Sequence, residues 1–210
     1  MDIIRKEELT QILDEIVTTM EGAKEELIEL DGAMGDGDLG LTMVKGFTAV
    51  AEEIRTLDET DMGKIMMKLG LKMNATAPST MGTLVSTCFL KAAPAAKGKT
   101  ELTLADMVEM GRGAVAGVME RGKSKPGDKT MLDALYPAVE ALGAAAAAGD
   151  SLTDAWQKAY EAAKDGMEKT TSMQSVHGRA AYYQEKSVGR QDPGATAMMY
   201  IVSGIAKAVR

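Results

Sequence analysis

Three aspartates, Asp31, Asp36 and Asp38, lie in a glycine-rich segment that separates two helix-like stretches. Carboxylates this close in sequence repel one another unless a cation lies among them, and hard oxygen ligands of this type suit Mg²⁺ or Ca²⁺. The glycines of the segment permit sharp turns and let backbone N–H groups approach an anion closely. The pattern therefore indicates a metal–phosphate site. The alternative is a turn whose aspartates only cap the next helix.

The net charge excludes one large class of phosphate-binding proteins. The chain has 210 residues and a formal net charge of −7, whereas proteins that bind nucleic acids hold the phosphate backbone on basic surfaces. We therefore expect no nucleic-acid partner. Any phosphate bound by so acidic a chain needs a metal ion to offset the repulsion.

Cysteine content and hydropathy indicate the compartment. Cys88 is the single cysteine and lies in an apolar run, which excludes an internal disulfide and fits the reducing cytosol. The amino-terminal residues are charged where a signal peptide needs an apolar run, and no apolar stretch is long enough to cross a membrane. No Pro/Ser-rich linker divides the sequence. We predict a cytoplasmic protein, without membrane contact, made of one domain over residues 1–210.

Apolar residues recur at spacings of three and four along almost the whole chain, as in helices with one buried stripe. Strand patterns are absent, so the predicted fold class is all-α. Capping residues mark several starts, with Thr103, Ser151 and Asp192 as N-caps and Pro193 at the first position of the last helix. The eight predicted helices cover about residues 9–30, 42–55, 61–74, 81–96, 103–120, 131–148, a segment after 151, and 192–209.

The loops between these helices fall into two groups. Short connections favour antiparallel neighbours, so alternate loops lie at the same end of the molecule. One end receives brief polar turns, and the other receives the acidic segment, the turn at 75–80, the loop at 121–130 and the long stretch at about 175–191. Long loops in a compact domain are often functional. We therefore predict a site at this second end, the alternative being that loop lengths vary by chance.

The long stretch supplies the one histidine, His177, and Arg179 two residues later. An arginine near a metal-held phosphate neutralises charge that develops during phosphoryl transfer. Arg179 is therefore the first catalytic candidate, against the alternative of a solvated side chain or a structural ion pair. His177 is interpreted as a loop residue that orients its neighbours, with a general base as the minority interpretation.

Four motifs in this order resemble the small nucleotide-binding subunit of dihydroxyacetone kinase, and the likeness spans essentially the whole chain. The motifs are Leu30-Asp31 with Gly35-Asp-Gly-Asp38, Gly127-Asp-Lys-Thr-Met-Leu-Asp-Ala-Leu135, Gly178-Arg-Ala180 and Asp192-Pro-Gly-Ala-Thr196. The resemblance implies an eight-helix antiparallel up-and-down barrel that holds a nucleotide across one open end. This agrees with the loop argument made above.

The resemblance also implies a role for particular residues. Asp31, Asp36 and Asp38 would bind two Mg²⁺ ions that bridge the diphosphate of ADP, or of ATP in the charged form. Arg179 would reach the phosphates. The other implied contacts are the amides of Leu39, Gly40, Leu41 and Thr42 to phosphate, Thr80 and Met81 to phosphate, and Gly122, Met131, Asp192, Pro193 and Gly194 around adenine and ribose.

Partners follow from the same resemblance. The chain would transfer a phosphoryl group to dihydroxyacetone, or to a related short hydroxyketone, bound on a larger ketose-binding kinase subunit. A phosphohistidine protein of the sugar phosphotransferase system would recharge the bound ADP, although a subunit that uses free ATP is not excluded. A regulatory role, in which the nucleotide-charged chain binds a transcriptional regulator without transfer, and a purely structural helical module stay as alternatives. The oligomeric state, including a homodimer, is left open.

Two departures from the family pattern bear on nucleotide affinity. The family usually has a polar residue, often His, where this chain has Leu39. Its third loop usually reads Gly-Gly-x-Ser-Gly, whereas residues 78–82 read Pro-Ser-Thr-Met-Gly here. Met81 offers no hydroxyl to phosphate, so Ser79 and Thr80 are the residues that could compensate.

Overall fold

The computed structural model describes residues 3–210. Within that range the chain forms eight α-helices and two 3₁₀ segments and no strand, apart from an isolated bridge between Ile4 and Leu102. The helices are α1 (Lys6–Gly32), α2 (Leu39–Thr56), α3 (Met62–Thr76), α4 (Thr80–Ala96), α5 (Leu104–Gly122), α6 (Leu132–Ala148), α7 (Leu152–Lys169), η1 (Thr170–Ser172), η2 (Arg179–Ser187) and α8 (Pro193–Ala208). The all-α prediction is confirmed.

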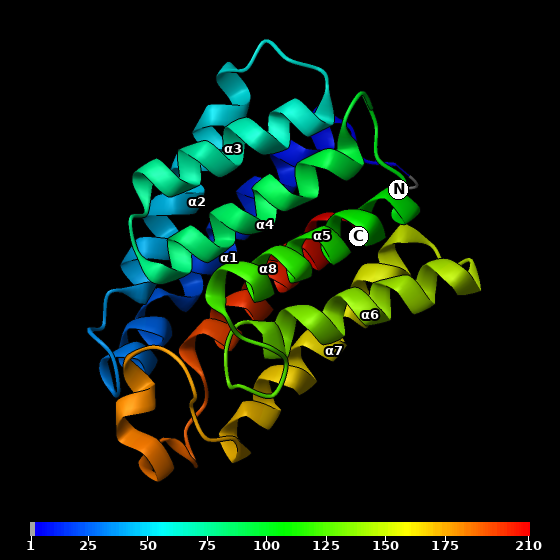
Figure 1. The fold of residues 1–210 in the computed structure, drawn as a ribbon. Coiled ribbons are helices and arrows are strands. Elements are labelled where there is room, and N and C mark those ends of the chain that lie inside the picture. The colour runs from blue at the N-terminus through cyan, green and yellow to red at the C-terminus, as the bar shows by residue number, and fades with distance from the viewer. Residues whose placement is uncertain (1–2) are drawn as a thin grey trace.

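The α-helices form a closed up-and-down barrel. Each helix packs against the next one along the chain, and α1 also packs against α8, which closes the ring. Figure 1 shows the long helices running back and forth along a common diagonal. Antiparallel packing of this kind follows from the short connections, because a short loop places each helix beside the preceding one and in the opposite direction.

The core lies between the helices and is built from the predicted apolar stripes. In α1 the buried side chains follow the three-and-four spacing, and Leu13, Met20 and Leu27 are each no more than 1% exposed. Methionines elsewhere take part in the same core, since Met43 and Met73 are fully buried. The abundant methionines therefore mostly fill the core, as their helical spacing suggested.

The predicted caps occur as expected. Thr103 and Asp106 form a reciprocal capping box at the start of α5, and the hydroxyl of Ser151 accepts the amide of Asp154 at the start of α7. The carboxylate of Asp192 accepts the amide of Ala195, with Pro193 as the first residue of α8. Each cap satisfies an amide that the helix itself leaves unpaired.

The structure corrects the predicted start of one helix and the description of one loop. The second helix begins at Leu39 and not near 42, because the carboxylate of Asp31 accepts the amides of Asp38 (3.1 Å) and Leu39 (3.3 Å) and so caps α2 from the preceding helix. The long stretch at 175–191 is also not without structure. It contains η2, which is interrupted at Gln184, where φ is +50°.

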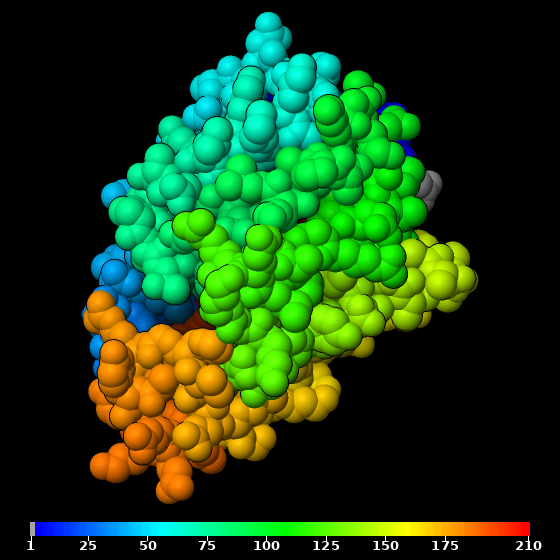
Figure 2. All heavy atoms as spheres, viewed as in Figure 1, coloured from blue at the N-terminus to red at the C-terminus, as the bar shows by residue number. Residues whose placement is uncertain are grey.

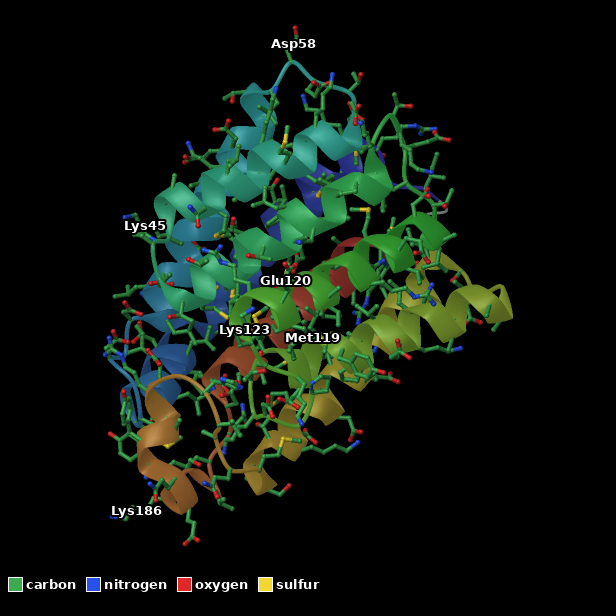
Figure 3. All side chains as sticks on the ribbon, in the orientation of Figure 1. Lys45, Asp58, Met119, Glu120, Lys123 and Lys186 are labelled. Atoms are coloured by element: carbon green, nitrogen blue, oxygen red, sulfur yellow. The ribbon has the colours of Figure 1, made fainter. Side chains whose placement is uncertain are left out.

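The loops separate into two ends as predicted. We call "the mouth" the end formed by residues 33–38, 77–79, 123–131 and 170–192, and "the closed end" the end formed by 57–61, 97–103 and 149–151. In Figure 3, Lys186 marks the mouth and Asp58 marks the closed end, at opposite extremes of the molecule. None of the helices in residues 3–210 is long and apolar enough to cross a membrane.

Candidate functional site

The three aspartates of the sequence analysis converge at the mouth. Asp31 belongs to the last turn of α1, Asp36 to the following loop, and Asp38 is the N-cap residue of α2. One oxygen atom from each carboxylate lies within 4.8 Å of the others. This donor set of three hard oxygen ligands with a combined negative charge fits a divalent cation such as Mg²⁺.

Glycine is required to bring these carboxylates together. Gly37 has a φ of +71°, which L side chains rarely adopt. A Cβ atom added at Gly35 would collide with the carboxylate of Asp31. The loop also folds back on α1, since the amide of Gly35 donates to the carbonyl of Asp31 at 2.6 Å. The glycines noted in the sequence therefore have a direct role in shaping this cluster.

The surroundings of Asp38 disfavour its ionised form. Burial and the neighbouring charges of Asp36 and Asp31 raise the pKa of Asp38, while Arg179 acts in the opposite direction. Asp31 takes the capping role that the alternative interpretation assigned to the aspartates, but the side chains of Asp36 and Asp38 cap no helix. A capping turn alone therefore does not account for the cluster.

Arg179, the predicted catalytic residue, reaches this cluster from the start of η2. Its guanidinium lies 2.7 Å from a carboxylate oxygen of Asp36, and the two side chains are 65% and 43% exposed. Arg179 also lines a cavity of about 350 Å³ with Met34, Tyr182 and Tyr183. Figure 2 shows the orange surface around η2 beside the blue surface near the start of α2, with a hollow between them and the green helices.

The start of α2 offers two free amides beside the carboxylates. Of the four predicted phosphate-contacting amides, that of Leu39 donates to Asp31 and that of Thr42 donates to the carbonyl of Asp38. Those of Gly40 and Leu41 have no acceptor among the described residues. Free amides at a helix N-terminus favour an anion.

The start of α4 contributes two hydroxyls, one of which also caps the helix. Ser79 is the N-cap of α4 and accepts the amide of Gly82 at 3.0 Å, so its oxygen already has a structural partner. Thr80 is exposed, and no hydrogen bond of its side chain occurs within residues 3–210, whereas Met81 is 9% exposed. Both hydroxyls expected to compensate for Met81 therefore keep a hydrogen to donate to a ligand, because Ser79 only accepts in its cap.

Two of the residues predicted around adenine and ribose, Gly194 and Met131, lie close to each other. A Cβ atom at Gly194 would be 3.5 Å from the amide nitrogen of Met131, which places the start of α8 against the start of α6. Asp192 is buried below them. Its burial raises its pKa to about 7, and the neighbouring charge of Asp133 acts in the same direction.

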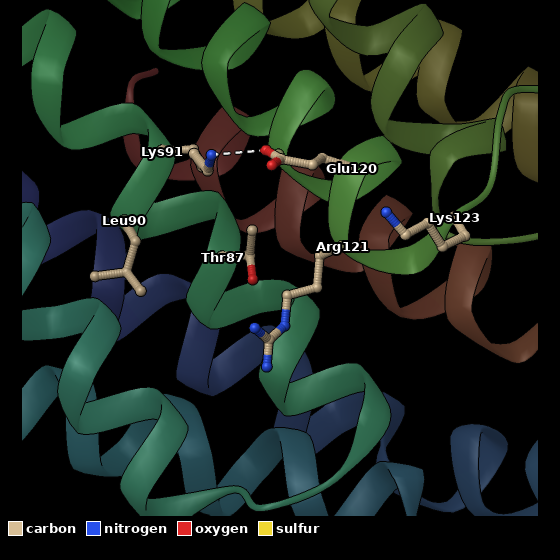
Figure 4. Close-up of a pocket in the computed structure, with 7 residues that line it drawn as sticks. Thr87, Leu90, Lys91, Glu120, Arg121 and Lys123 are labelled. Carbon is tan, nitrogen blue, oxygen red and sulfur yellow. Dashed lines mark hydrogen bonds and ion pairs between the residues drawn. The ribbon is translucent and has the colours of Figure 1, made fainter.

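Gly122 ends α5, next to a second surface cavity. A Cβ atom at Gly122 would be 3.1 Å from the hydroxyl of Ser124. The cavity has about 440 Å³ and lies between α4 and α5, where Figure 4 shows Arg121 and Lys123 on one side and Thr87 on the other. No hydrogen bond or ion pair in the described part of the chain joins Gly122, Thr80 or Met81 to the aspartate cluster.

Sequence reasoning missed a set of buried polar residues beneath the mouth. Lys129 and Asp133 are 2% and 5% exposed, and both belong to the motif at 127–135 that was noted only for its family likeness. Asp133 accepts the amides of Gly127 (2.6 Å) and Thr130 (2.7 Å) and so shapes the α5–α6 loop. The sequence did contain a signal for these residues, namely the many charged residues in the loop at 121–130.

His177 contacts the α5–α6 loop, as expected of a residue that orients its neighbours. Its Nε2 lies 3.1 Å from a carboxylate oxygen of Asp128. Burial raises the pKa of Asp128, but the amide of Lys125 and the imidazole of His177 outweigh it, so that the pKa is lowered overall. The amide of Val176 donates to the carbonyl of the same Asp128 at 3.3 Å. These contacts attach the last loop to the α5–α6 loop.

Comparison with known proteins identifies the family. The sequence profile of the DAK2 domain matches residues 33–207. The chain belongs to the DAK2 domain family.

Curated relatives of this DAK2 chain carry kinase names. It is 37% identical over 186 residues to the Escherichia coli K12 protein named PEP-dependent dihydroxyacetone kinase, ADP-binding subunit DhaL, with 89% of each chain covered. It is 32% identical over 204 residues to the D-erythrulose kinase of Mycolicibacterium smegmatis, covering 96% of this chain and 35% of that protein. The chain thus spans most of the first relative and about a third of the second.

A solved structure supports the fold of the DAK2 domain. The dihydroxyacetone kinase from C. freundii, solved in complex with AMP-PNP and Mg²⁺, superposes with a TM-score of 0.72 at 24% identity. The match covers 94% of this chain and 33% of that one. At this identity the likeness establishes the shared helical architecture.

Proposed function

We propose that this chain is the nucleotide-holding subunit of a dihydroxyacetone kinase, acting as one nucleotide-binding domain over residues 1–210. It binds ADP, or ATP in the charged form, and transfers a phosphoryl group to dihydroxyacetone or a related short hydroxyketone held by a larger partner subunit. The observation that carries the proposal is the meeting of Asp31, Asp36 and Asp38 with Arg179 at the mouth. Membership of the DAK2 family and the name of the E. coli relative support the same activity.

The three carboxylates would hold Mg²⁺, and we propose two ions because the resemblance to the dihydroxyacetone kinase subunit implies two. When bound, the ions supply positive charge that offsets the charge of the phosphates in a protein of net charge −7. The fit rests on the donor set itself, three carboxylate oxygens within 4.8 Å, and on the raised pKa of Asp38. A cation relieves the repulsion among these groups.

The protein's own groups position the phosphates. The free amides of Gly40 and Leu41 lie at the start of α2, directly after the carboxylates, and would donate to phosphate oxygens. Thr80, through its hydroxyl, and Met81 lie at the start of α4 and would contact the phosphates as well. Gly122, Met131 and the turn at 192–194 would surround the adenine and ribose.

Arg179 would act as the charge-neutralising residue during transfer. Its pairing with Asp36 is exposed on both sides, and exposed ion pairs contribute only about 0–1 kcal/mol. Little free energy is therefore needed to move the guanidinium from Asp36 to a phosphate once a metal ion takes over that carboxylate. A regulatory protein without transfer activity could dispense with a charge-neutralising arginine in this place, whereas a transferase could not, so the regulatory alternative is not favoured.

The donor and the acceptor are the finer parts of the proposal. The name of the E. coli relative favours recharging by a phosphohistidine protein of the phosphotransferase system over exchange with free ATP. The D-erythrulose kinase among the relatives keeps a four-carbon ketose open as the acceptor.

The test reconstitutes transfer with separate donor arms. The purified chain is first examined by native mass spectrometry, with and without Mg²⁺, for retained ADP or ATP. It is then combined with its ketose-binding partner and supplied either with ATP or with phosphoenolpyruvate and the phosphotransferase proteins, using dihydroxyacetone and erythrulose as acceptors. We expect bound ADP and transfer in the phosphoenolpyruvate arm. No bound nucleotide together with no transfer in either arm would overturn the proposal.

A further inference from the structure

Lys129 is a lysine in an unusual environment. It lies in the α5–α6 loop and is 2% exposed, which makes it one of the largest fully buried side chains in the described residues. Burial of an ammonium group costs several kcal/mol unless the group is well bonded. No carboxylate forms an ion pair with it within residues 3–210. Such a residue needs an explanation other than core packing.

The ammonium of Lys129 donates to three backbone carbonyls. Its Nζ lies 3.1 Å from the oxygen of Met173, 2.6 Å from that of Ser187 and 2.6 Å from that of Arg190. These three bonds use all the hydrogens that a lysine ammonium has to donate. Burial lowers the pKa of Lys129, and the nearby charge of Asp192 opposes this effect.

The three carbonyls belong to both ends of one excursion of the chain. We call residues 173–190 "the mouth segment". Met173 stands at its beginning, whereas Ser187 and Arg190 stand at its end, so one ammonium holds the two ends together. Two further bonds lie at the same place, from the amide of Ser175 to the hydroxyl of Ser187 (2.9 Å) and from the amide of Gly189 to the carbonyl of Thr171 (2.8 Å).

The distal part of the mouth segment has few attachments of its own. His177 and Val176 bind Asp128, next to Lys129 in the α5–α6 loop. Beyond them, Arg179 contacts Asp36, and Tyr182 is 87% exposed. The position of Arg179 above the aspartates is therefore set mainly by the way the segment is held at its base.

We propose that Lys129 is a positioning residue whose buried ammonium closes the base of the mouth segment and thereby places Arg179 over the aspartate cluster. The kinetic consequence rests on the proposed function, while the structural consequence does not. Loss of the ammonium would free three carbonyls and let the segment open on Gly178 and Gly189, both of which have positive φ.

The first test is structural and needs no activity. Lys129→Met keeps the length of the side chain without its charge, and Lys186→Met, an exposed lysine on the same segment, is the matched control. We expect amide hydrogen exchange at Ser175, Val176 and Gly189 to accelerate by at least about tenfold in Lys129→Met alone, with helices α1 to α4 unchanged. Unchanged protection of these amides, or acceleration throughout the barrel, would overturn the proposal.

The second test separates positioning from catalysis. In the reconstituted kinase we expect Lys129→Met to lower kcat at least about tenfold with little change in nucleotide retention, and Lys129→Arg to restore part of it. Combined with Arg179→Ala, Lys129→Met should cost nothing further, because the two changes act through the same group. Fully additive losses would overturn the proposal.

Two safeguards keep the outcomes distinct. If Lys129→Met does not fold, Lys129→Gln, which retains two donor hydrogens, takes its place, and the same acceleration of exchange at the base is expected. If the wild-type chain transfers no phosphoryl group but the exchange pattern follows the substitutions, the proposed function fails and the structural role of Lys129 stands. If transfer proceeds and neither hydrogen exchange nor kcat changes when Lys129 is substituted, the proposed role of Lys129 fails and the proposed function stands.

Discussion

Several aspartates at the two ends of the barrel have pKa values shifted in opposite directions. At the closed end, burial raises the pKa of Asp106, but the ammonium of Lys99 and the groups of Thr103 outweigh it, and the pKa is lowered overall. The pKa of Asp61 is likewise lowered, because hydrogen bonds from the amides of Gly98, Lys64 and Gly63 outweigh the effect of burial. At the mouth, the pKa values of Asp38 and Asp192 are raised.

The direction of the pKa shift separates carboxylates that stabilise the fold from carboxylates that destabilise it when they are ionised. A carboxylate with a lowered pKa contributes to the free energy of unfolding, whereas one with a raised pKa subtracts from it when ionised. Asp128 lies at the mouth but is bonded to Lys125 and His177. Its pKa is lowered, like those of Asp61 and Asp106 at the closed end. The raised values therefore mark particular groups, and Asp38 belongs to the cluster for which we propose metal binding.

The largest expected effect is on transfer at the mouth. Arg179→Ala should lower phosphoryl transfer by about a thousandfold, because it removes charge neutralisation of the transferred group, while bound ADP is retained. Single-turnover transfer and native mass spectrometry measure the two quantities. Arg190→Ala, an exposed arginine of the mouth segment, is the matched control and should remain active. Unchanged turnover in Arg179→Ala would remove this residue from the mechanism.

The next effect is on ligand binding and stability. Asp36→Asn or Asp38→Asn should abolish nucleotide retention and leave the helical circular dichroism nearly intact, since these side chains stand outside the core. In the wild type, Mg²⁺ and ADP at 100 times the dissociation constant should stabilise the fold by about 2.7 kcal/mol, and this increment should vanish in both variants.

The matched control for these substitutions is Asp58→Asn at the closed end, which should keep the full increment (Figure 3). Thermal unfolding with and without ligand measures the increment. A ligand-dependent shift that survives in Asp36→Asn and Asp38→Asn would show that the cluster does not hold the metal.

The last prediction concerns two opposite pH dependences of the free energy of unfolding. Asp192 has a folded pKa of about 7 against an unfolded value of 3.8, so its contribution lowers the free energy of unfolding as pH rises between these values, by at most about 1.4 kcal/mol per pH unit. Asp192→Asn should remove this slope. The pKa of Asp106 is lowered, so its contribution to the free energy of unfolding is present above pH 3.8 and is lost as pH falls below that value.

Urea unfolding across pH 3 to 8 measures both contributions. Asp106→Ala should cost about 1 kcal/mol near pH 7, through loss of the capping box, and progressively less in acid. The same slope in wild type and in Asp192→Asn would mean that the fold does not raise the pKa of Asp192 above its unfolded value, and the contrast between the two ends would no longer hold for it.

Much of the fold could be predicted because its determinants are local. The spacing of apolar residues defined the helices, and Thr103, Ser151 and Asp192 marked their starts within a few positions. The start of α2 was misplaced because its cap, Asp31, lies in the preceding helix and is joined to Leu39 only after the loop has folded. A cap contributed from another helix leaves no mark in the local pattern.

The candidate site divides in the same way. The sequence by itself determined the aspartate cluster, since three carboxylates and the glycines that turn between them are close along the chain. Only the tertiary structure decided that Arg179 meets Asp36, that Lys129 binds both ends of the mouth segment, and that Asp192 is buried enough to raise its pKa. Charge interactions and desolvation depend on distances through space, and the helices must pack before those distances exist.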